Sequence, residues 1–403
     1  MPYAMKKTIR CIRFLSIIVF PAAVLLAVVY QIGCVEAQSL DIPNRRYGLS
    51  IGNSREFTGL RINFRDRDVD EIKGVNITLW KAGKNESADI NGLSLGVFSP
   101  EAGNLTGVQI GGIGVQAHGD LTGLSLGLLG AGAGGDITGI TFGGLGTGAG
   151  GDITGLTAGL LGAGAAQDIT GITFGGLGAG AGGDITGITF ALLGAGAGGD
   201  ITGMTVGGLA AGSGGDISGL TIGMVTGAAE DVTGITCGGV TGAGGDLTGL
   251  TLGFLGAGAG GDMTGFTLGL LGAGSGSDIK GITLGGIGAA AGGDVTGITF
   301  GGIAAGCGSD LTGLTVGGIA AGAGGDILGV TIALGTVRTG DDNDMTGAAV
   351  SAYNRINGDV TGLSLGIVNI ANDLNGFQVG LINYVRDNPG YRRILPLVNW
   401  NFD

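Results

Sequence analysis

The feature that most constrains this chain is a sixteen-residue repeat that runs through most of its length. The segment "DITGITFGGLGAGAGG" spans residues 168–183, and near copies begin at Asp184 and Asp200. We number the Asp of each copy as position 0 and the residues after it as positions 1 to 15. The spacing is sixteen, with two fifteens, along one column: Asp120, Asp136, Asp152, Asp168, Asp184, Asp200, Asp216, Asp231, Asp246, Asp262, Asp278, Asp294, Asp310 and Asp326. Such self-similarity predicts stacked units that share one core.

Weaker copies extend the column at both ends, and all of them keep Gly at position 3. They begin at Asp89, Asn104, Asp344, Asp359 and Asp373. The chain contains 96 glycines, and a glycine-rich interior disfavours helix. We therefore expect an all-β chain.

The apolar residues of one repeat fall at positions 1, 4, 6, 9, 11 and 13. Steps of two keep side chains on one strand face, whereas steps of three need a corner, for which Gly171 and the pair Gly175–Gly176 are suited. The pattern predicts one coil of a β-solenoid per repeat. The side chains predicted inside are Ile169, Ile172, Phe174, Leu177, Ala179 and Ala181. Those predicted outside are Asp168, Thr170 and Thr173.

Position 8 shows an alternation that a solenoid does not require. It reads Leu128, Gly144, Leu160, Gly176, Leu192, Gly208, Met224, Gly239 and Phe254. Neighbouring strands of an antiparallel meander run oppositely, so a period of 32 would be natural there. The alternative fold is therefore an antiparallel meander closed into an outer-membrane β-barrel.

The N-terminus has the pattern of a secretory signal peptide. A basic segment precedes an apolar run from Phe14 to Val29, and Val35-Glu36-Ala37 is suited to cleavage after Ala37. Lipid attachment at Cys34 is the alternative. Cleavage would remove four of the 19 Lys and Arg and one of the 32 Asp and Glu, leaving a net charge of −16. This charge disfavours nucleic acid and anionic lipid as partners.

The composition changes along the chain predict four segments. These are a signal peptide (1–37), an N-terminal cap with degenerate repeats (38–88), the regular array (89–337), and degenerate repeats with a C-terminal cap (338–403). Charge-rich stretches near both ends favour covers for the open ends of the stack.

Two segments outside the regular array resemble a known family. "GLSLGIVNIANDLNGFQVGLINYVRDNPGYRRILPLVNWNFD" (362–403) and "GLRINFRDRDVDEIKGVNITLW" (59–80) are similar to the closing and opening segments of bacterial surface-repeat proteins. Those proteins are built from Gly-Leu-x-Ile-Gly-Leu-x-Asn units. The resemblance implies export and a location at the cell surface or outer membrane, and it implies no catalytic residues.

Several motifs in the repeats have a structural interpretation beside a functional one. The Asp column fits hydrogen bonds to the backbone at turns. The functional alternative is a calcium-binding solenoid, and we expect only weak uptake of divalent cations by this column. "GAGAGG" (130–135) matches a dinucleotide fingerprint, but no helix or ribose-binding acid follows, so no nucleotide is expected. The Thr columns at positions 2 and 5 suit an ice-binding solenoid only if they share one face. His118, Cys237 and Cys307 are expected to be incidental or packing residues, with no disulfide.

No nucleophile, base and orienting acid can be assembled from Thr, Asp and Gly alone. The sequence therefore predicts no enzyme, no catalytic, cofactor-binding or metal residues, and no cofactor. It predicts an exported bacterial surface or envelope repeat protein with a structural or adhesive scaffold role and an unidentified envelope partner. The alternative barrel would carry a channel or anchoring role.

Overall fold

The computed structural model describes residues 39–402, and within that range the secondary structure consists of strands without helices. The predicted signal peptide and Cys34 lie outside the described residues. The chain divides into two compact units, with the boundary between Gly119 and Asp120. Each unit is a β-solenoid, as the repeat predicts.

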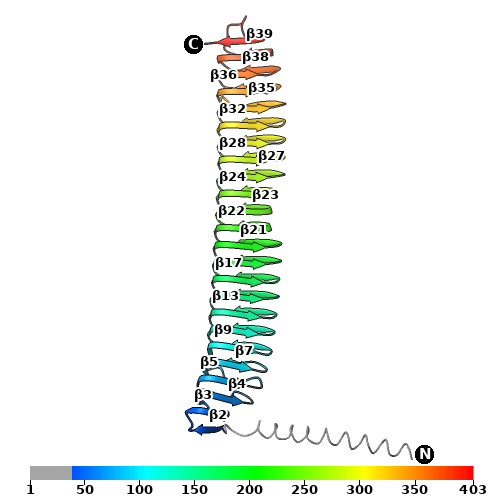
Figure 1. Cartoon of the computed structure of the whole chain (residues 1–403). Helices are drawn as coiled ribbons and strands as arrows, with labels where there is room; N and C mark the ends of the chain where they lie inside the picture. Colours follow the sequence, from blue (N-terminus) through cyan, green and yellow to red (C-terminus); the bar gives the residue numbers. More distant parts are fainter. Residues whose placement is uncertain (1–38, 403) are drawn as a thin grey trace, which may run out of the picture. The chain divides into compact units, whose positions relative to one another are not determined.

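One coil of the second unit consists of a long strand and a short strand joined by two turns. In the coil that begins at Asp168, β15 (Ile169–Gly175) forms one wall and β16 (Gly178–Ala181) forms the other. β15 pairs in parallel with the equivalent strands of the coils before and after it, and every residue lies opposite its equivalent sixteen residues away. The short strands pair in the same way, so the coils stack in register (Figure 1).

This parallel pairing shows that the alternative fold, an antiparallel meander, is wrong. Antiparallel strands would place opposite ends of neighbouring repeats together, whereas here Ile169 lies beside Ile185 and Phe174 beside Phe190. The channel role that depended on the meander loses its structural basis.

The remaining strands of the second unit follow the same plan. The long strands are β9 (Leu121–Gly127), β11 (Ile137–Gly143), β13 (Ile153–Gly159), β17 (Ile185–Ala191), β19 (Ile201–Gly207), β24 (Met263–Gly269), β26 (Ile279–Gly285), β28 (Val295–Gly301), β30 (Leu311–Gly317), β32 (Ile327–Ala333), β34 (Met345–Val350) and β36 (Val360–Leu365). The short strands are β10 (Gly130–Ala133), β12 (Gly146–Ala149), β14 (Gly162–Ala165), β18 (Gly194–Ala197), β20 (Ala210–Ser213), β25 (Gly272–Ser275), β27 (Gly288–Ala291), β29 (Ala304–Cys307), β31 (Ala320–Ala323), β33 (Thr336–Asp341), β35 (Tyr353–Asn357) and β37 (Val368–Ala371).

Four coils have one strand that continues through the turn between the walls. These strands are β21 (Ile217–Ala228), β22 (Val232–Ala243), β23 (Leu247–Ala259) and β38 (Leu374–Val385). The last strand, β39 (Ile394–Asn401), lies antiparallel on β38 and covers that end of the stack.

The first unit has more polar coils of uneven length. Its strands are β1 (Ser39–Pro43), β2 (Tyr47–Gly52), β3 (Glu56–Asn63), β4 (Glu71–Thr78), β5 (Asp89–Gly96), β6 (Glu101–Ala102), β7 (Asn104–Gly111) and β8 (Gly114–Ala117). β2, β3, β4, β5 and β7 stack in parallel, whereas β1 pairs antiparallel with β2 and so covers the first coil.

The predicted inside and outside of the coil are partly wrong. Ile169 and Ala179 are buried as predicted, but Thr173 is also fully buried. Phe174 and Leu177, predicted inside, are each 45% exposed, and Ile172 is only half-buried. Along the long wall the odd positions face inward and the even positions outward, in simple alternation.

The reason is that the two walls lie too close together for large side chains. A Cβ atom added to Gly175 would lie 1.8 Å from the carbonyl oxygen of Gly178 on the opposite wall. Only Gly, Ala and one Thr fit into this narrow part, and the large Ile169 fits near the Asp turn. Sorting residues by hydrophobicity alone therefore misplaced Phe174.

Of the two predicted corners, the one at Gly171 is wrong, whereas Gly176 of the predicted pair Gly175–Gly176 does lie in a turn. Gly171 lies inside β15 with φ +131° rather than at a corner. The chain turns at residues 176–177 and again at residues 182–184. A Cβ atom on Gly171 would lie 2.1 Å from the carbonyl oxygen of Gly155 in the preceding coil, so Gly here lets successive coils approach.

Candidate interaction surface

The turn at positions 8 and 9 forms a continuous apolar strip on the second unit, which we call the leucine edge. Its apolar residues are Leu128, Leu129, Leu145, Leu160, Leu161, Leu177, Leu192, Leu193, Leu209, Met224, Val225, Val240, Phe254, Leu255, Leu270 and Leu271. Each is between 45% and 71% exposed. Soluble proteins rarely expose so extended an apolar strip unless it binds something.

Outward side chains of the long wall widen this apolar strip. Positions 4 and 6 carry Ile140 and Phe142 in one coil, each more than 40% exposed. In-register stacking brings equivalent side chains together, so the rings of Phe174 and Phe190 stack with centroids 5.2 Å apart. Sequence reasoning placed these residues in the core, and the alternation at position 8 was the only signal of an outer apolar edge.

The opposite turn is acidic and joins the coils. The Asp168 Oδ1 atom accepts a hydrogen bond of 2.8 Å from the backbone N–H of Asp184, and this pattern continues from Asp120 to Asp359. In the other direction the N–H of Ile169 donates to the carbonyl oxygen of Asp184, also at 2.8 Å. The Asp residues lie at turns and accept backbone hydrogen bonds as predicted, but the donor belongs to the next coil and not to the residues that directly follow the Asp.

The Gly before most Asp residues is explained by the same contact. A Cβ atom on Gly183 would lie 2.1 Å from Asp168 Oδ1. The "Gly-Gly-Asp" phrase therefore makes room for the carboxylate of the preceding coil. Among the described residues no group of three or more His, Cys, Asp or Glu side chains is placed to hold a metal ion, and weak calcium uptake stays a prediction.

Two members of the Asp column have opposite electrostatic environments. The Asp278 N–H and the Lys280 ammonium, 3.1 Å from Asp262 Oδ2, lower the pKa of Asp262 below its ordinary value. Burial, followed by the neighbouring carboxylates of Asp344 and Asp373, raises the pKa of Asp359.

These shifts predict substitutions of opposite sign. A carboxyl group whose pKa is raised in the folded state stabilises the fold at pH values below its unfolded-state pKa of about 3.9. This contribution is lost as the pH rises through the folded-state pKa. Asp359→Asn should therefore raise the thermal midpoint at neutral pH and lose this advantage in acid.

Asp262→Asn should lower the thermal midpoint at neutral pH. A carboxyl group whose pKa is lowered in the folded state stabilises the fold at pH values above about 3.9, and that contribution is lost as the pH falls through the folded-state pKa. Thermal melts at neutral and acid pH check both, and equal shifts of the same sign would contradict the assignment.

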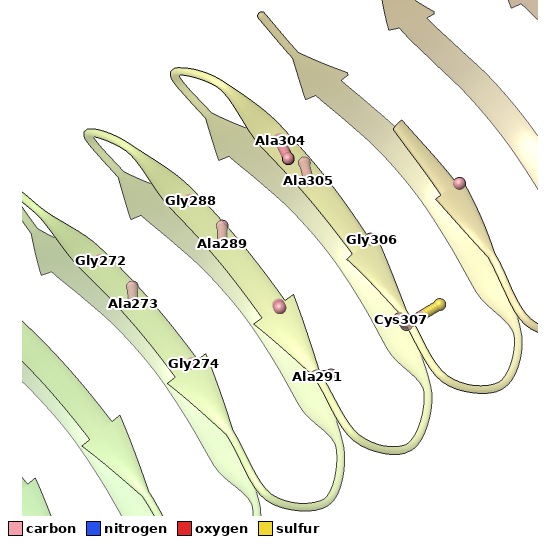
Figure 2. A pocket seen from close by; sticks show the side chains of 12 residues that line it. Gly272, Ala273, Gly274, Gly288, Ala289, Ala291, Ala304, Ala305, Gly306 and Cys307 are labelled. Carbon is pink, nitrogen blue, oxygen red and sulfur yellow. The ribbon is translucent and has the colours of Figure 1, made fainter. Parts of the chain in front are cut away.

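The short wall carries a depression of about 660 Å³. Figure 2 shows Ala273, Ala289 and Ala305 in equivalent places on adjacent coils, with Cys307 at one end. Its lining consists of Gly and Ala residues and Cys307. Burial raises the pKa of the Cys307 thiol to about 11, so little of this thiol is ionised to thiolate at neutral pH.

The other motif residues have structural places. Cys237 and Cys307 are both free thiols, which confirms the prediction for these two residues. His118 Nε2 lies 3.3 Å from Glu101 Oε1. The "GAGAGG" segment forms β10 and the turn after it, and the strand β11 follows instead of a helix.

The two Thr columns do not share a face, because Thr170 is exposed whereas Thr173 is buried. The structure thus supplies no flat double row of Thr hydroxyls.

Sequence reasoning missed a buried ion pair in the first unit. Arg61 occupies position 5, where most other coils carry Thr or Ser, and its guanidinium pairs with the carboxylate of Asp66. Both side chains are fully buried, and Asn76 Oδ1 accepts a further bond from Arg61 at 2.7 Å. The pair neutralises two buried charges within one coil, which assigns it a structural role. The sign of this pair in the sequence was an Arg at a repeat position that most coils fill with Thr or Ser.

No family model, curated protein or solved structure matches the chain in the comparisons with known proteins. Within residues 39–402 no helix is long and apolar enough to cross a membrane.

Proposed function

We propose that this chain is an exported bacterial surface or envelope protein with a structural, adhesive scaffold role. The observation that carries the proposal is the leucine edge, which presents the same apolar side chains at regular steps over many coils. A rigid, repetitive surface of this kind suits lengthwise contact with another extended surface. The N-terminal pattern of basic residues, apolar run and Val35-x-Ala37 supports export.

Charge supports the same proposal. The Asp column lies at the turn opposite the leucine edge in every regular coil, so one side of the coil is acidic and the other apolar. The acidic side keeps the protein soluble, and the apolar side is available for contact.

The experiment that tests the proposal is fractionation of bacteria that produce the full chain with its own first 37 residues. We expect the protein in the envelope or at the surface, digestible by protease added to intact cells, with an intact mass that begins at Gln38. A matched chain without residues 1–37 should remain in the cytosol. Recovery of the full chain from the cytosol with its N-terminus retained would contradict the proposal.

A further inference from the structure

Along the leucine edge, protruding side chains alternate with glycines. Leu128, Leu160 and Leu192 are each at least 70% exposed, and Met224 continues the series at 60%. We call these four residues the knobs. Between them lie Gly144, Gly176, Gly208 and Gly239, which we call the gaps. Because coils are spaced by about 4.8 Å, successive knobs lie roughly 9.6 Å apart with one gap between them.

Stacking of the coils does not require this alternation. Gly176 is needed where it stands, because a Cβ atom there would lie 1.7 Å from the carbonyl oxygen of Leu160. Yet Gly286, Gly302 and Gly318 occupy position 8 in three successive coils, and each would make a similar close contact with the coil before it. Coils with Gly at position 8 therefore stack directly on one another. Stacking does not require a large side chain at this position in every second coil, so the knobs serve another purpose.

We propose that the leucine edge binds the leucine edge of a second copy of this chain, with the knobs of each copy seated in the gaps of the other. Two antiparallel copies related by a two-fold axis satisfy this arrangement. Leu128 then lies at the second copy's Gly239, and Leu160 lies at its Gly208. Leu192 lies at the second copy's Gly176, and Met224 lies at its Gly144. This inference rests on the proposed scaffold function and names its partner.

Charge and area agree with this partner. Positions 8 and 9 carry no charged residue from Leu128 to Leu271, and the Asp column faces away from the contact, so two processed copies, each with a net charge of −16, meet at their uncharged side. A lipid surface would bind an uninterrupted row of Leu equally well and gives no reason for regular gaps. The part of the leucine edge that carries the knobs and gaps, from Leu128 to Gly239, is about 34 Å long and about 10 Å wide. This area is smaller than a standard interface, so the dimer should be weak.

Sedimentation of the full processed chain over micromolar to submillimolar concentrations measures this association. We expect a reversible monomer–dimer equilibrium. The double variant Leu160→Ser, Leu192→Ser should raise the dissociation constant by about tenfold or more, because each copy loses two buried apolar contacts. The matched control is Leu334→Ser, because Leu334 stands at the same position, is 81% exposed and lies outside the alternating series. That control should leave the dissociation constant unchanged, and an equal effect of both variants would overturn the proposal.

Single-cysteine variants test the orientation in a background without the native cysteines. In the antiparallel dimer Leu177→Cys lies about one coil from its equivalent in the second copy, so it should form a disulfide-linked dimer. Leu129→Cys, with 47% exposure against 45%, lies about 34 Å from its equivalent and should not. Equal cross-linking at both sites would overturn the arrangement.

Flotation with neutral phosphatidylcholine vesicles tests the competing occupant. A chain that stays monomeric and floats with the vesicles would overturn the inference in favour of lipid. A monomeric chain that still fractionates with the envelope overturns this inference alone, whereas a cytosolic chain overturns the proposed function and leaves the dimer measurement interpretable.

Discussion

Thr173→Asp should destabilise the second unit by about 3 kcal/mol or more. Thr173 is fully buried between the two walls, so the new carboxylate would lose its hydration with no partner charge beside it. Phe174→Asp, one residue later, should cost only about 1 kcal/mol, because the new side chain faces solvent and only the stacking on Phe190 is lost. Denaturant unfolding of the purified protein measures both.

A conservative variant shows whether the effect of Thr173→Asp comes from the buried charge or from any change of this side chain. The Thr173 hydroxyl has no hydrogen-bond partner. Thr173→Val should therefore be neutral or stabilising, because it removes an unsatisfied buried polar group and keeps the shape. If Thr173→Asp proves as mild as Phe174→Asp, the inward orientation of position 5 is wrong.

Gly171→Ala should also be severe, with a loss of about 3 kcal/mol or more. Gly171 has φ +131°, which a residue with a Cβ atom rarely adopts, and the added atom would lie 2.1 Å from the carbonyl oxygen of Gly155. The three nearest atoms all belong to the backbone of Gly155, so no flexible side chain can move aside. Because each coil contacts only its neighbours, the loss should appear as early local unfolding, detected by proteolysis within the array.

The matched control for this variant is Gly194→Ala. A Cβ atom on Gly194 would meet nothing within 4 Å, and the equivalent position already carries Ala in Ala210, Ala304 and Ala320. Its stability should stay within about 0.5 kcal/mol of the parent. Equal effects of the two glycine variants would show that close packing at Gly171 does not hold the coils together.

The solenoid itself was predictable because the repeat period determines how many residues each coil contains. Repeats of sixteen with Gly at fixed positions can share a core only by stacking, and the column from Asp120 to Asp326 marks the same turn in each coil. The deep burial of Ile169 and Ala179 also follows from their apolar character at strand positions.

The side-chain orientation of the long wall was not predictable from hydrophobicity. Ile172 and Phe174 are among the most apolar residues of the repeat, yet the walls are close enough that Gly175 has no space for a Cβ atom. Wall separation depends on the opposite strand, which no single position reveals. A strict period of two from Ile169 to Gly175 would have placed Thr173 inside.

The leucine edge was missed for the same reason. The residues at position 9 were assigned to the core and those at position 8 to neither side. The alternation between Leu160 and Gly176 therefore pointed toward an antiparallel meander instead of an outer surface. Once the coils are known to be parallel and in register, this alternation needs a cause outside the coil.

The central claim is that the coils stack in register, and distances between paired spin labels test it most directly. Thr138, Thr202, Thr233 and Thr264 occupy position 2 of their coils and are all exposed. Pairs of labels at 138/202, 138/233 and 138/264, in a chain without its native cysteines, are separated by four, six and eight coils. The stack predicts mean distances of about 19, 29 and 38 Å, a rise of about 4.8 Å per coil. Distances that fail to increase linearly with the number of coils would contradict it.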